Sequence, residues 1–291
     1  MPTLPRHRLP YSAIVDRPKL ALPGDARMIV WTIVNVEEWD IQRAMPRTVL
    51  PPPMHQPLLP DLPNWAWHEY GMRVGFWRLR DCLRAFKVIP TLAINGSVCQ
   101  SYPPVAQAAL DAGWEFMGHG HTQRPMHHLD DECDAIRQAI QAIRDFTGKR
   151  PRGWESPGLT ETYDTIDLLA EEGIEYVADW VLDDQPCEIA TKHGPIVSIP
   201  YTLEINDVAT IAVQTHSPVE FERRAVDQFD RLYRESESIT RVMAISLHPY
   251  LSGVAHRIKY VEAIYEHIAR RPGVLFWTGE QILDWYSALR K

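Results

Sequence analysis

Short apolar runs rich in β-branched and aromatic residues recur along the chain with helical patterns between them, and this alternation most constrains the fold. The first run, Met28–Asn35, reads Met-Ile-Val-Trp-Thr-Ile-Val-Asn, which is typical of a strand buried on both faces. Strands that alternate with helices favour a parallel sheet, because parallel neighbours need long crossovers. The predicted strands are Met28–Asn35, Val88–Ile94, Trp114–Met117, Tyr176–Ala178, Ile196–Ile199, Met243–Leu247 and Val274–Trp277.

Helical periodicity fills several of the intervals between these runs. Arg73–Phe86 carries apolar residues on one face, and Asp130–Phe146 does so with acids in its first turn, where they favour the helix dipole. Ser217–Glu220 has the pattern of a capping box with proline at the first helical position, and Thr278–Gln281 has a similar capping pattern. Both patterns predict helix starts.

Seven or eight such strands predict an α/β fold, a deformed or incomplete (β/α) barrel of parallel strands. A doubly wound open sheet is the alternative, but no Gly-x-Gly-x-x-Gly fingerprint follows the first strand. Twenty-four prolines, many of them before Asn64, favour an arm or long loops at the start of the chain. We therefore expect a single barrel domain over residues 28–291, preceded by a proline-rich N-terminal arm over residues 1–27.

Composition excludes several classes of protein. Thirty basic and 38 acidic residues give a net charge of −8, which argues against a nucleic-acid binder with a basic patch. No segment is apolar over the length of a bilayer, and the first residues lack the apolar stretch of a signal peptide, so we expect no membrane contact and a cytoplasmic location. The four cysteines, Cys82, Cys99, Cys133 and Cys187, are widely spaced and are expected to be reduced thiols.

Polar side chains follow the apolar runs at the points where the strands end. In a (β/α) barrel the carboxyl ends of the strands meet at one rim, and that rim carries the chemistry. Carboxylates and imidazoles gathered there predict a pocket suited to acid–base catalysis. The side chains at these strand ends are Glu37, Glu38, His119, His121, Gln123, Trp154, Glu155, Asp179, Trp180, Asn206, Asp207 and His248.

Glu37 and Glu38 come directly after the first strand. Two close carboxylates cannot both ionise freely, so one of them can hold a proton and serve as an acid or base. The alternative is a pair of exposed acids on a loop. Because the preceding strand is buried, we favour the catalytic interpretation.

Three histidines are candidates for the same pocket. His119 and His121 lie two residues apart, so an extended backbone directs both to one side, where they could bind metal, orient a substrate carbonyl or cap a loop. We place His119 in the pocket, and His121 stays open between these roles. His248 is a candidate to protonate a leaving group, with a core histidine bonded to backbone as the alternative.

Further polar and aromatic residues at strand ends have less specific patterns. Asp179, Asn206 and Asp207 could orient a histidine or bind a polar substrate, and could equally be helix caps or turn residues. Trp154 and Trp180 flank polar strand ends, whereas tryptophans are core residues by default.

The order of these motifs resembles the polysaccharide deacetylase (NodB-homology) family, in particular the branch that contains the metal-independent allantoinases. The resemblance covers roughly Met28 to Trp285, and Tyr201–Asp207 is similar to a stretch of the allantoinase-like branch. The motifs that carry it are Asn35-Val-Glu37-Glu38, Gly118-His119-Gly120, Trp154-Glu155-Ser156-Pro157-Gly158, Asp179-Trp180 and Leu247-His248.

The resemblance implies hydrolysis of a non-peptide carbon–nitrogen bond on a deformed (β/α) barrel. By position it implies that Glu37 is the general base and His248 the general acid. It also implies that Glu38 and His119 are ligands of one divalent metal ion such as zinc.

Two positions depart from the family pattern. Gln123 stands where the family has its second metal histidine, and Glu155 stands where the third motif has an arginine. Zinc sites with an open position use three protein ligands from His, Asp, Glu or Cys, so the ligand set is incomplete. The sequence therefore leaves the cofactor open.

Together these motifs predict a hydrolase that acts on an amide or cyclic amide of a small molecule. The alternatives are a metal-dependent N-deacetylase of an acetylated sugar, a non-catalytic ligand-binding protein on the same barrel, and an interaction domain without a pocket. The resemblance also implies a homo-oligomer. The residues expected to contact substrate are His121, Gln123, Trp154, Asp179, Trp180, Asn206 and Asp207.

Overall fold

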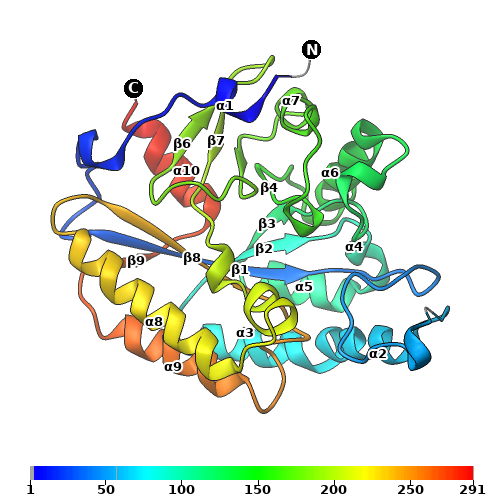
Figure 1. Ribbon diagram of the computed structural model, residues 1–291. Coiled ribbons are helices and arrows are strands. Elements are labelled where there is room, and N and C mark those ends of the chain that lie inside the picture. The colour runs from blue at the N-terminus through cyan, green and yellow to red at the C-terminus, as the bar shows by residue number, and fades with distance from the viewer. Residues whose placement is uncertain (1–2, 57, 291) are drawn as a thin grey trace.

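A computed structural model describes residues 3–56 and 58–290, and within them nine strands form one sheet that curls into a deformed (β/α) barrel (Figure 1). The strand order is β6-β7-β5-β4-β3-β2-β1-β8, and β9 pairs with β1 beside this path. All pairs are parallel except β6 with β7, so the predicted fold class is confirmed. The strands are β1 (Met28–Val36), β2 (Thr91–Ile94), β3 (Glu115–Gly118), β4 (Gly153–Trp154), β5 (Tyr176–Val177), β6 (Cys187–Ile189), β7 (Ile196–Ser198), β8 (Arg241–Leu247) and β9 (Val274–Phe276).

Helices cover the outside and one end of this sheet. Helix α9 packs against α8 and α3 on the outer face, whereas α10 lies near β6 and β7 (Figure 1). Among the described residues, no helix combines the length and apolar character needed to cross a bilayer. The helices are α1 (Pro5–Arg8), α2 (Leu62–Tyr70), α3 (Phe76–Ala85), α4 (Val98–Ser101), α5 (Pro103–Asp111), α6 (Glu132–Thr147), α7 (Thr165–Glu171), α8 (Pro218–Glu235), α9 (Ile258–Ala269) and α10 (Gly279–Ala288).

Alternation along β1 decides which side chains reach the barrel interior. The odd-numbered residues from 29 to 33 pack inside the barrel with Met117 and Tyr176. Even-numbered residues of the same strand pack with Leu79 and Phe229 of the outer helices. Because successive side chains of a strand point to opposite faces, the same alternation directs Asn35 and Glu37 inward.

The register around β1 brings distant loops to one rim. β1 pairs with β8 over Met28–Val34 and with β2 over Ile33–Val36. An isolated parallel bridge joins Asn206 to Ser246, which brings the chain after β7 to β8. Since these strands run parallel, the loops that follow them open on the same side of the barrel.

A π-helical turn at Gly71–Gly75 joins α2 to α3 and lies against the loop after β8. A Cβ atom on Gly75 would lie 2.1 Å from the carbonyl oxygen of Pro249, and one on Gly71 would lie 2.6 Å from the backbone nitrogen of Tyr250. Only glycine permits this approach. The glycines therefore hold α2 next to the rim.

Several element boundaries differ from the sequence prediction. The helix predicted from Arg73 lies in a helical run that starts earlier, with α2, which Asp61 caps. The second strand begins at Thr91 rather than Val88, because the Val88 N–H bonds to the Leu83 carbonyl at the end of α3. The short antiparallel strand β6 was not predicted.

The two predicted capping patterns form to different extents. Ser217 accepts a hydrogen bond from the Glu220 N–H, but the return bond that completes a capping box is absent. At α10 both bonds of the box are present, between Thr278 and Gln281. Both helix starts are therefore where the sequence placed them.

The N-terminal arm is anchored to the barrel by ion pairs. The Arg8 guanidinium, 4% exposed, donates two hydrogen bonds of 2.7 Å to the Asp167 carboxylate on α7. Arg17 pairs with Asp183 at 2.7 Å. A buried bidentate pair of this kind fixes the geometry of the segment that carries it. The division into an arm over 1–27 and a barrel domain over 28–291 stays a prediction.

A buried carboxyl group closes the amino end of the barrel beneath α10. Glu115 accepts hydrogen bonds from the Thr91 hydroxyl at 2.6 Å and the Tyr176 hydroxyl at 2.5 Å. The backbone N–H of Glu280, in the first turn of α10, donates to it at 3.1 Å. Burial raises the pKa of Glu115 to about 7, although these donors act in the opposite direction.

Unfolding measurements should detect this carboxyl group. The folded pKa of about 7 lies above the ordinary 4.5, so the contribution of Glu115 is complete below pH 4.5 and is lost as the pH rises to 7. The difference corresponds to about 3 kcal/mol at most. We expect Glu115→Gln to remove this part of the change in unfolding free energy between pH 5 and pH 8, measured by urea denaturation. Glu175→Gln, which alters an exposed acid near the same end of the barrel, is the control; an unchanged slope in Glu115→Gln would contradict the assignment.

Candidate active site

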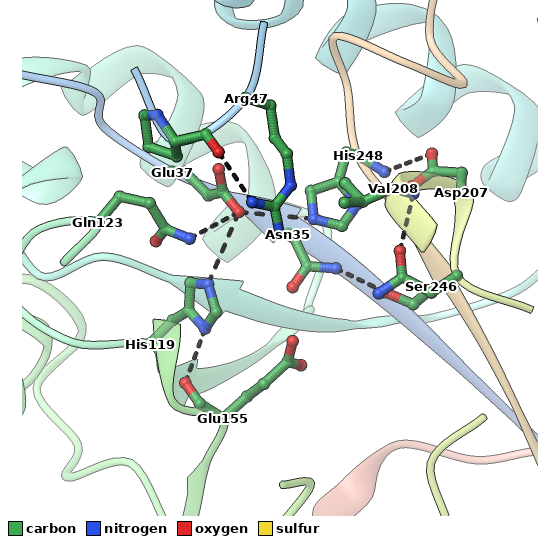
Figure 2. A network of polar contacts seen from close by, with 12 residues as sticks. Asn35, Glu37, Arg47, His119, Gln123, Glu155, Asp207, Val208, Ser246 and His248 are labelled. Atoms are coloured by element: carbon green, nitrogen blue, oxygen red, sulfur yellow. Dashed lines mark hydrogen bonds and ion pairs between the residues drawn. The ribbon is translucent and has the colours of Figure 1, made fainter. Parts of the chain in front are cut away.

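Loops at the carboxyl rim of the barrel enclose a cavity of about 1300 Å³. Glu37, His119 and His248, which follow β1, β3 and β8, all line it (Figure 2). The structure thus brings the predicted base, the predicted acid and one further imidazole together, and it argues against an interaction domain without a pocket. Other predicted site residues in the cavity wall are Glu38, Gln123 and Asn206.

The Glu37 carboxylate lies at the centre of these groups and is only 5% exposed. One oxygen, Oε2, accepts a hydrogen bond of 2.6 Å from the indole of Trp39. The other, Oε1, lies 3.5 Å from His248 Nε2 and 3.8 Å from His119 Nε2. Burial acts to raise the pKa of Glu37, but the two imidazoles outweigh it and hold the pKa well below its usual range. Glu37 is therefore an ionised carboxylate in the folded protein.

His248 is held by Asp207 in a fixed tautomer. Its Nδ1 donates to the Asp207 carboxylate at 2.7 Å, and its backbone N–H donates to the other oxygen of that carboxylate at 2.8 Å. The Ser252 hydroxyl also donates to Asp207, at 2.6 Å. Burial lowers the pKa of His248, but Asp207 and Glu37 outweigh burial and raise it to about 10. The Nε2 atom of His248 therefore carries a proton toward the cavity.

His119 has the same arrangement with a backbone partner. Its Nδ1 donates to the Glu155 carbonyl oxygen at 2.7 Å, so Nε2 faces Glu37. This Nε2 is buried and makes no hydrogen bond within the described part of the chain. Burial lowers the pKa of His119, but Glu37 and Glu155 outweigh it and give a net increase. The net increase favours the imidazolium form of His119, in which Nε2 is a donor directed into the cavity.

Gln123 completes the ring of donors around Glu37. Its side-chain Nε2 donates to Glu37 Oε1 at 2.9 Å, and its Oε1 accepts from Asn95 at 3.1 Å. Asn95, at the end of β2, is fully buried. Sequence reasoning missed Asn95, although it follows a predicted strand in the same way as the other site residues.

The Glu155 side chain lines the inner part of the cavity without an ion-pair partner. It is 3% exposed, and its Oε2 makes no hydrogen bond in the described ranges. Figure 2 shows the carboxyl group directed away from the His119 ring and toward the Asn35 side chain. Burial raises the pKa of Glu155, and the attraction of His119 and His248 offsets only part of that effect.

Two aromatic groups behind Glu37 also escaped sequence reasoning. His68 of α2 stacks on Trp39 with ring centroids 4.4 Å apart, and Tyr250 packs edge-on against the same indole. Burial lowers the pKa of His68 to about 4, so this imidazole is neutral at pH 7. Helix α2 was not predicted, and its sequence carries no signal that links His68 to the rim.

Several predicted substrate contacts lie elsewhere. Asp179 and Trp180 line a second cavity of about 540 Å³, and Asp179 accepts hydrogen bonds from Ser156 rather than facing Glu37. Trp154 packs outward, because alternation along β4 turns it toward α6. His121 lies beside Gly120 in a small separate cavity. Their predicted contact with a substrate at Glu37 is not supported by this placement.

Two other predicted substrate contacts, Asn206 and Asp207, form hydrogen bonds with neighbouring residues of the site. Asn206 donates from Nδ2 to the Tyr201 hydroxyl at 2.7 Å and accepts the Val208 N–H at 2.8 Å. Asp207 is fully buried and binds His248. Asp207 therefore orients a histidine, one of the roles the sequence left open for it.

The donor set at the rim does not fit a divalent metal ion. Glu38 accepts a hydrogen bond from the Ser101 hydroxyl at 2.9 Å, and Gln123 directs an N–H toward Glu37 where a metal ligand would direct a lone pair. Over residues 3–56 and 58–290, no three His, Cys, Asp or Glu side chains are grouped as metal ligands. The implied metal pair of Glu38 and His119 thus lacks a third ligand.

The (β/α) barrel thus holds a buried carboxylate, a carboxylate-bound imidazolium and a second imidazole together at its carboxyl rim, an arrangement suited to acid–base catalysis. The polysaccharide deacetylase family model matches residues 68–177. A polysaccharide deacetylase homologue of Schizosaccharomyces pombe is 30% identical over 243 residues, 76% of this chain and 75% of that protein. The chain belongs to the polysaccharide deacetylase family, and it is a hydrolase of non-peptide carbon–nitrogen bonds.

Other similar proteins are named as deacetylases or as an allantoinase. The peptidoglycan deacetylase of Helicobacter pylori is 25% identical over 249 residues, 74% of this chain and 84% of that protein. The crystal structure of a probable polysaccharide deacetylase from Pseudomonas aeruginosa PAO1 superposes with a TM-score of 0.84 at 28% identity, covering 95% of this chain and 98% of that one. The PuuE allantoinase structure gives a TM-score of 0.84 at 28% identity and covers 96% and 97%.

Replacement of Asp207 tests its hold on His248. An asparagine cannot accept both the Nδ1–H and the backbone N–H of His248, so Asp207→Asn should lower the pKa of His248 from about 10 toward 6.5. An NMR titration of the His248 ring measures this directly. Hydrolysis should fall roughly a hundredfold or more.

The matched control is Asp230→Asn, which removes the carboxylate partner of the surface residue His267 at 2.8 Å. It should change neither the His248 titration nor hydrolysis. A His248 titration that stays near pH 10 in Asp207→Asn would contradict the assigned role.

Proposed function

We propose that this chain hydrolyses an amide or cyclic amide of a small molecule, with Glu37 as the general base and His248 as the general acid. The observation that carries the proposal is the position of Glu37 Oε1, 3.5 Å from His248 Nε2 within one buried cavity. A base and an acid that face a common small space can act on the two sides of one bond.

The protonation states suit this division of roles. The ionised Glu37 carboxylate takes a proton from water as the water oxygen bonds to the amide carbon. The His248 imidazolium then gives its Nε2 proton to the leaving nitrogen as the carbon–nitrogen bond breaks. A base whose pKa is lowered is a weak base, so the entry of substrate between the two groups must weaken their ion pair.

The oxygen of the tetrahedral intermediate needs a donor of its own. His119 Nε2 is buried, carries no other hydrogen bond among the described residues and faces the same space as Glu37. The raised pKa of His119 favours its imidazolium form, in which Nε2 donates a hydrogen bond and carries positive charge toward an oxyanion. A preorganised donor in a water-poor site typically contributes about 3 kcal/mol to such a step.

A small ureide or hydantoin-like ring is the substrate class we favour. The similarity to PuuE allantoinase extends over 96% of this chain. An N-acetylated sugar is the second candidate, because the relatives from Schizosaccharomyces pombe and Helicobacter pylori are named for deacetylation of polysaccharide and peptidoglycan.

Cytoplasmic location and a homo-oligomeric state stay predictions from the sequence. Gel filtration with light scattering tests the oligomeric state.

Substitution of the acid–base pair tests the mechanism. We expect Glu37→Gln and His248→Ala each to lower kcat by roughly 10²–10⁴-fold, which is the range of a lost general base or acid. Glu266→Gln and His267→Ala replace an exposed acid and a surface histidine and should leave kcat unchanged. Folded Glu37→Gln and His248→Ala variants with full activity would refute the assignment.

A substrate panel with and without a metal chelator separates the candidate functions. The panel contains hydantoin-ring amides and N-acetylated sugars. We expect turnover of a cyclic amide that chelation leaves unchanged, since the rim lacks a third metal ligand. Deacetylation of a sugar that the chelator abolishes would establish the second candidate, and binding of a cyclic amide without turnover would refute the proposed function.

A further inference from the structure

Asn95 lies at the junction of three strand ends and has no role in the mechanism above. Its backbone N–H donates to the Val36 carbonyl of β1 at 3.1 Å, and its side chain is fully buried. The side-chain oxygen accepts the Glu38 backbone N–H at 2.8 Å. The side-chain Nδ2 donates to the carbonyl oxygen of His119 and, at 3.1 Å, to Gln123 Oε1.

Two backbone groups fix the orientation of the Asn95 amide, because one of them can only donate a hydrogen bond and the other can only accept one. A backbone N–H can only donate, so the oxygen of Asn95 must face Glu38. A backbone carbonyl can only accept, so the nitrogen of Asn95 must face His119. A flipped Asn95 amide would oppose donor to donor and acceptor to acceptor in a site without water contact, which is costly.

This fixed amide determines the orientation of the next one. Because Asn95 presents N–H groups to Gln123, the oxygen of Gln123 must face Asn95. The Nε2 of Gln123 then points toward Glu37 Oε1, at 2.9 Å. A reversed Gln123 amide would place its oxygen against a carboxylate oxygen, and this would repel Glu37.

Gln123 is the donor that holds Oε1 within hydrogen-bond distance. The two histidine nitrogens lie farther from this oxygen, at 3.5 and 3.8 Å, and the Trp39 indole holds the other oxygen. The direction in which the Glu37 carboxylate faces substrate therefore depends on a chain of hydrogen bonds that begins at the Glu38 backbone. The charged or titratable groups that also act on Glu37 are His68, His119, Glu155, His248 and Tyr250.

We propose that Asn95 is a positioning residue that acts through Gln123: it fixes the orientation of the Gln123 amide and so the orientation of the Glu37 carboxylate. The proposal rests on the proposed function only for the role of Glu37 as base. It gives Gln123, at the position of a family metal ligand, the task of holding the base by hydrogen bonding.

A double-mutant cycle on kcat tests the coupling. With the most rapidly hydrolysed amide of the panel, we expect Asn95→Ala and Gln123→Met each to lower kcat about tenfold to a hundredfold, with KM changed about threefold or less, since a misdirected base slows chemistry more than binding. The double variant should lose no more than Gln123→Met alone, because Asn95 acts through Gln123. Losses that multiply would overturn the proposal.

Two further variants distinguish the positioning role of Asn95 from a general disturbance of the structure. Asn95→Asp has the same shape and keeps the oxygen that meets the Glu38 N–H, but its second oxygen attracts the Gln123 N–H away from Glu37, so kcat should fall at least as much. Gln185→Ala removes a different buried amide, which donates to the Thr240 carbonyl at 3.0 Å far from the rim, and should leave kcat unchanged. Full activity of folded Asn95→Asp would contradict the proposal.

An NMR measurement separates this proposal from the proposed function. The side-chain amide resonance of Gln123, assigned by its loss in Gln123→Met, should shift in Glu37→Gln and in both Asn95 variants, without any ligand. An unmoved resonance in folded Asn95→Asp would overturn the positioning role. If the resonance shifts while no panel member is hydrolysed, the positioning role stands and the proposed function fails.

Discussion

The site depends on keeping the Glu37 carboxylate ionised inside the protein. Burial of a carboxylate is expensive unless donors and positive charge replace its water. Here one oxygen has the Trp39 indole, the other has the Gln123 amide, and two imidazoles lie within 4 Å. These groups come from the loops after β1, β3 and β8, so the barrel must close correctly before Glu37 can be buried as an anion.

Glu115, at the opposite end of the barrel, shows which kind of donor determines the pKa of a buried carboxyl group. Glu115 accepts hydrogen bonds from three neutral donors, and no cation contributes to its pKa shift. Its pKa is raised to about 7. Glu37 is equally buried, yet its pKa is held well below the ordinary range. Neutral hydrogen bonds offset only part of the loss of solvation at Glu115, whereas the interactions of His119 and His248 with Glu37 more than offset it.

The chain shares its barrel fold with the probable polysaccharide deacetylase of Pseudomonas aeruginosa, and in this chain the rim of that barrel carries the Glu37 carboxylate and the His119 and His248 imidazoles. Two positions at the rim depart from the family pattern. Gln123 supplies an N–H where the family pattern has a metal-binding histidine, and Glu155 supplies a buried carboxyl group where it has an arginine. The second change removes a positive charge from the family pattern, and the imidazoles of His119 and His248 are the basic groups that lie within 4 Å of Glu37.

The sequence alone determined where the strands lie along the chain and which polar residues follow each strand. Both depend on apolar runs and alternation among neighbouring residues, which are local properties of the sequence. That was enough to predict the barrel and to select Glu37, His119 and His248. The separation of Asp179 and Trp180 into another cavity, and the contacts of Asn95 and His68 with the site, depend on strand register, barrel curvature and the close approach of Gly75 to Pro249. These are long-range packing relations, so only the tertiary structure decided them.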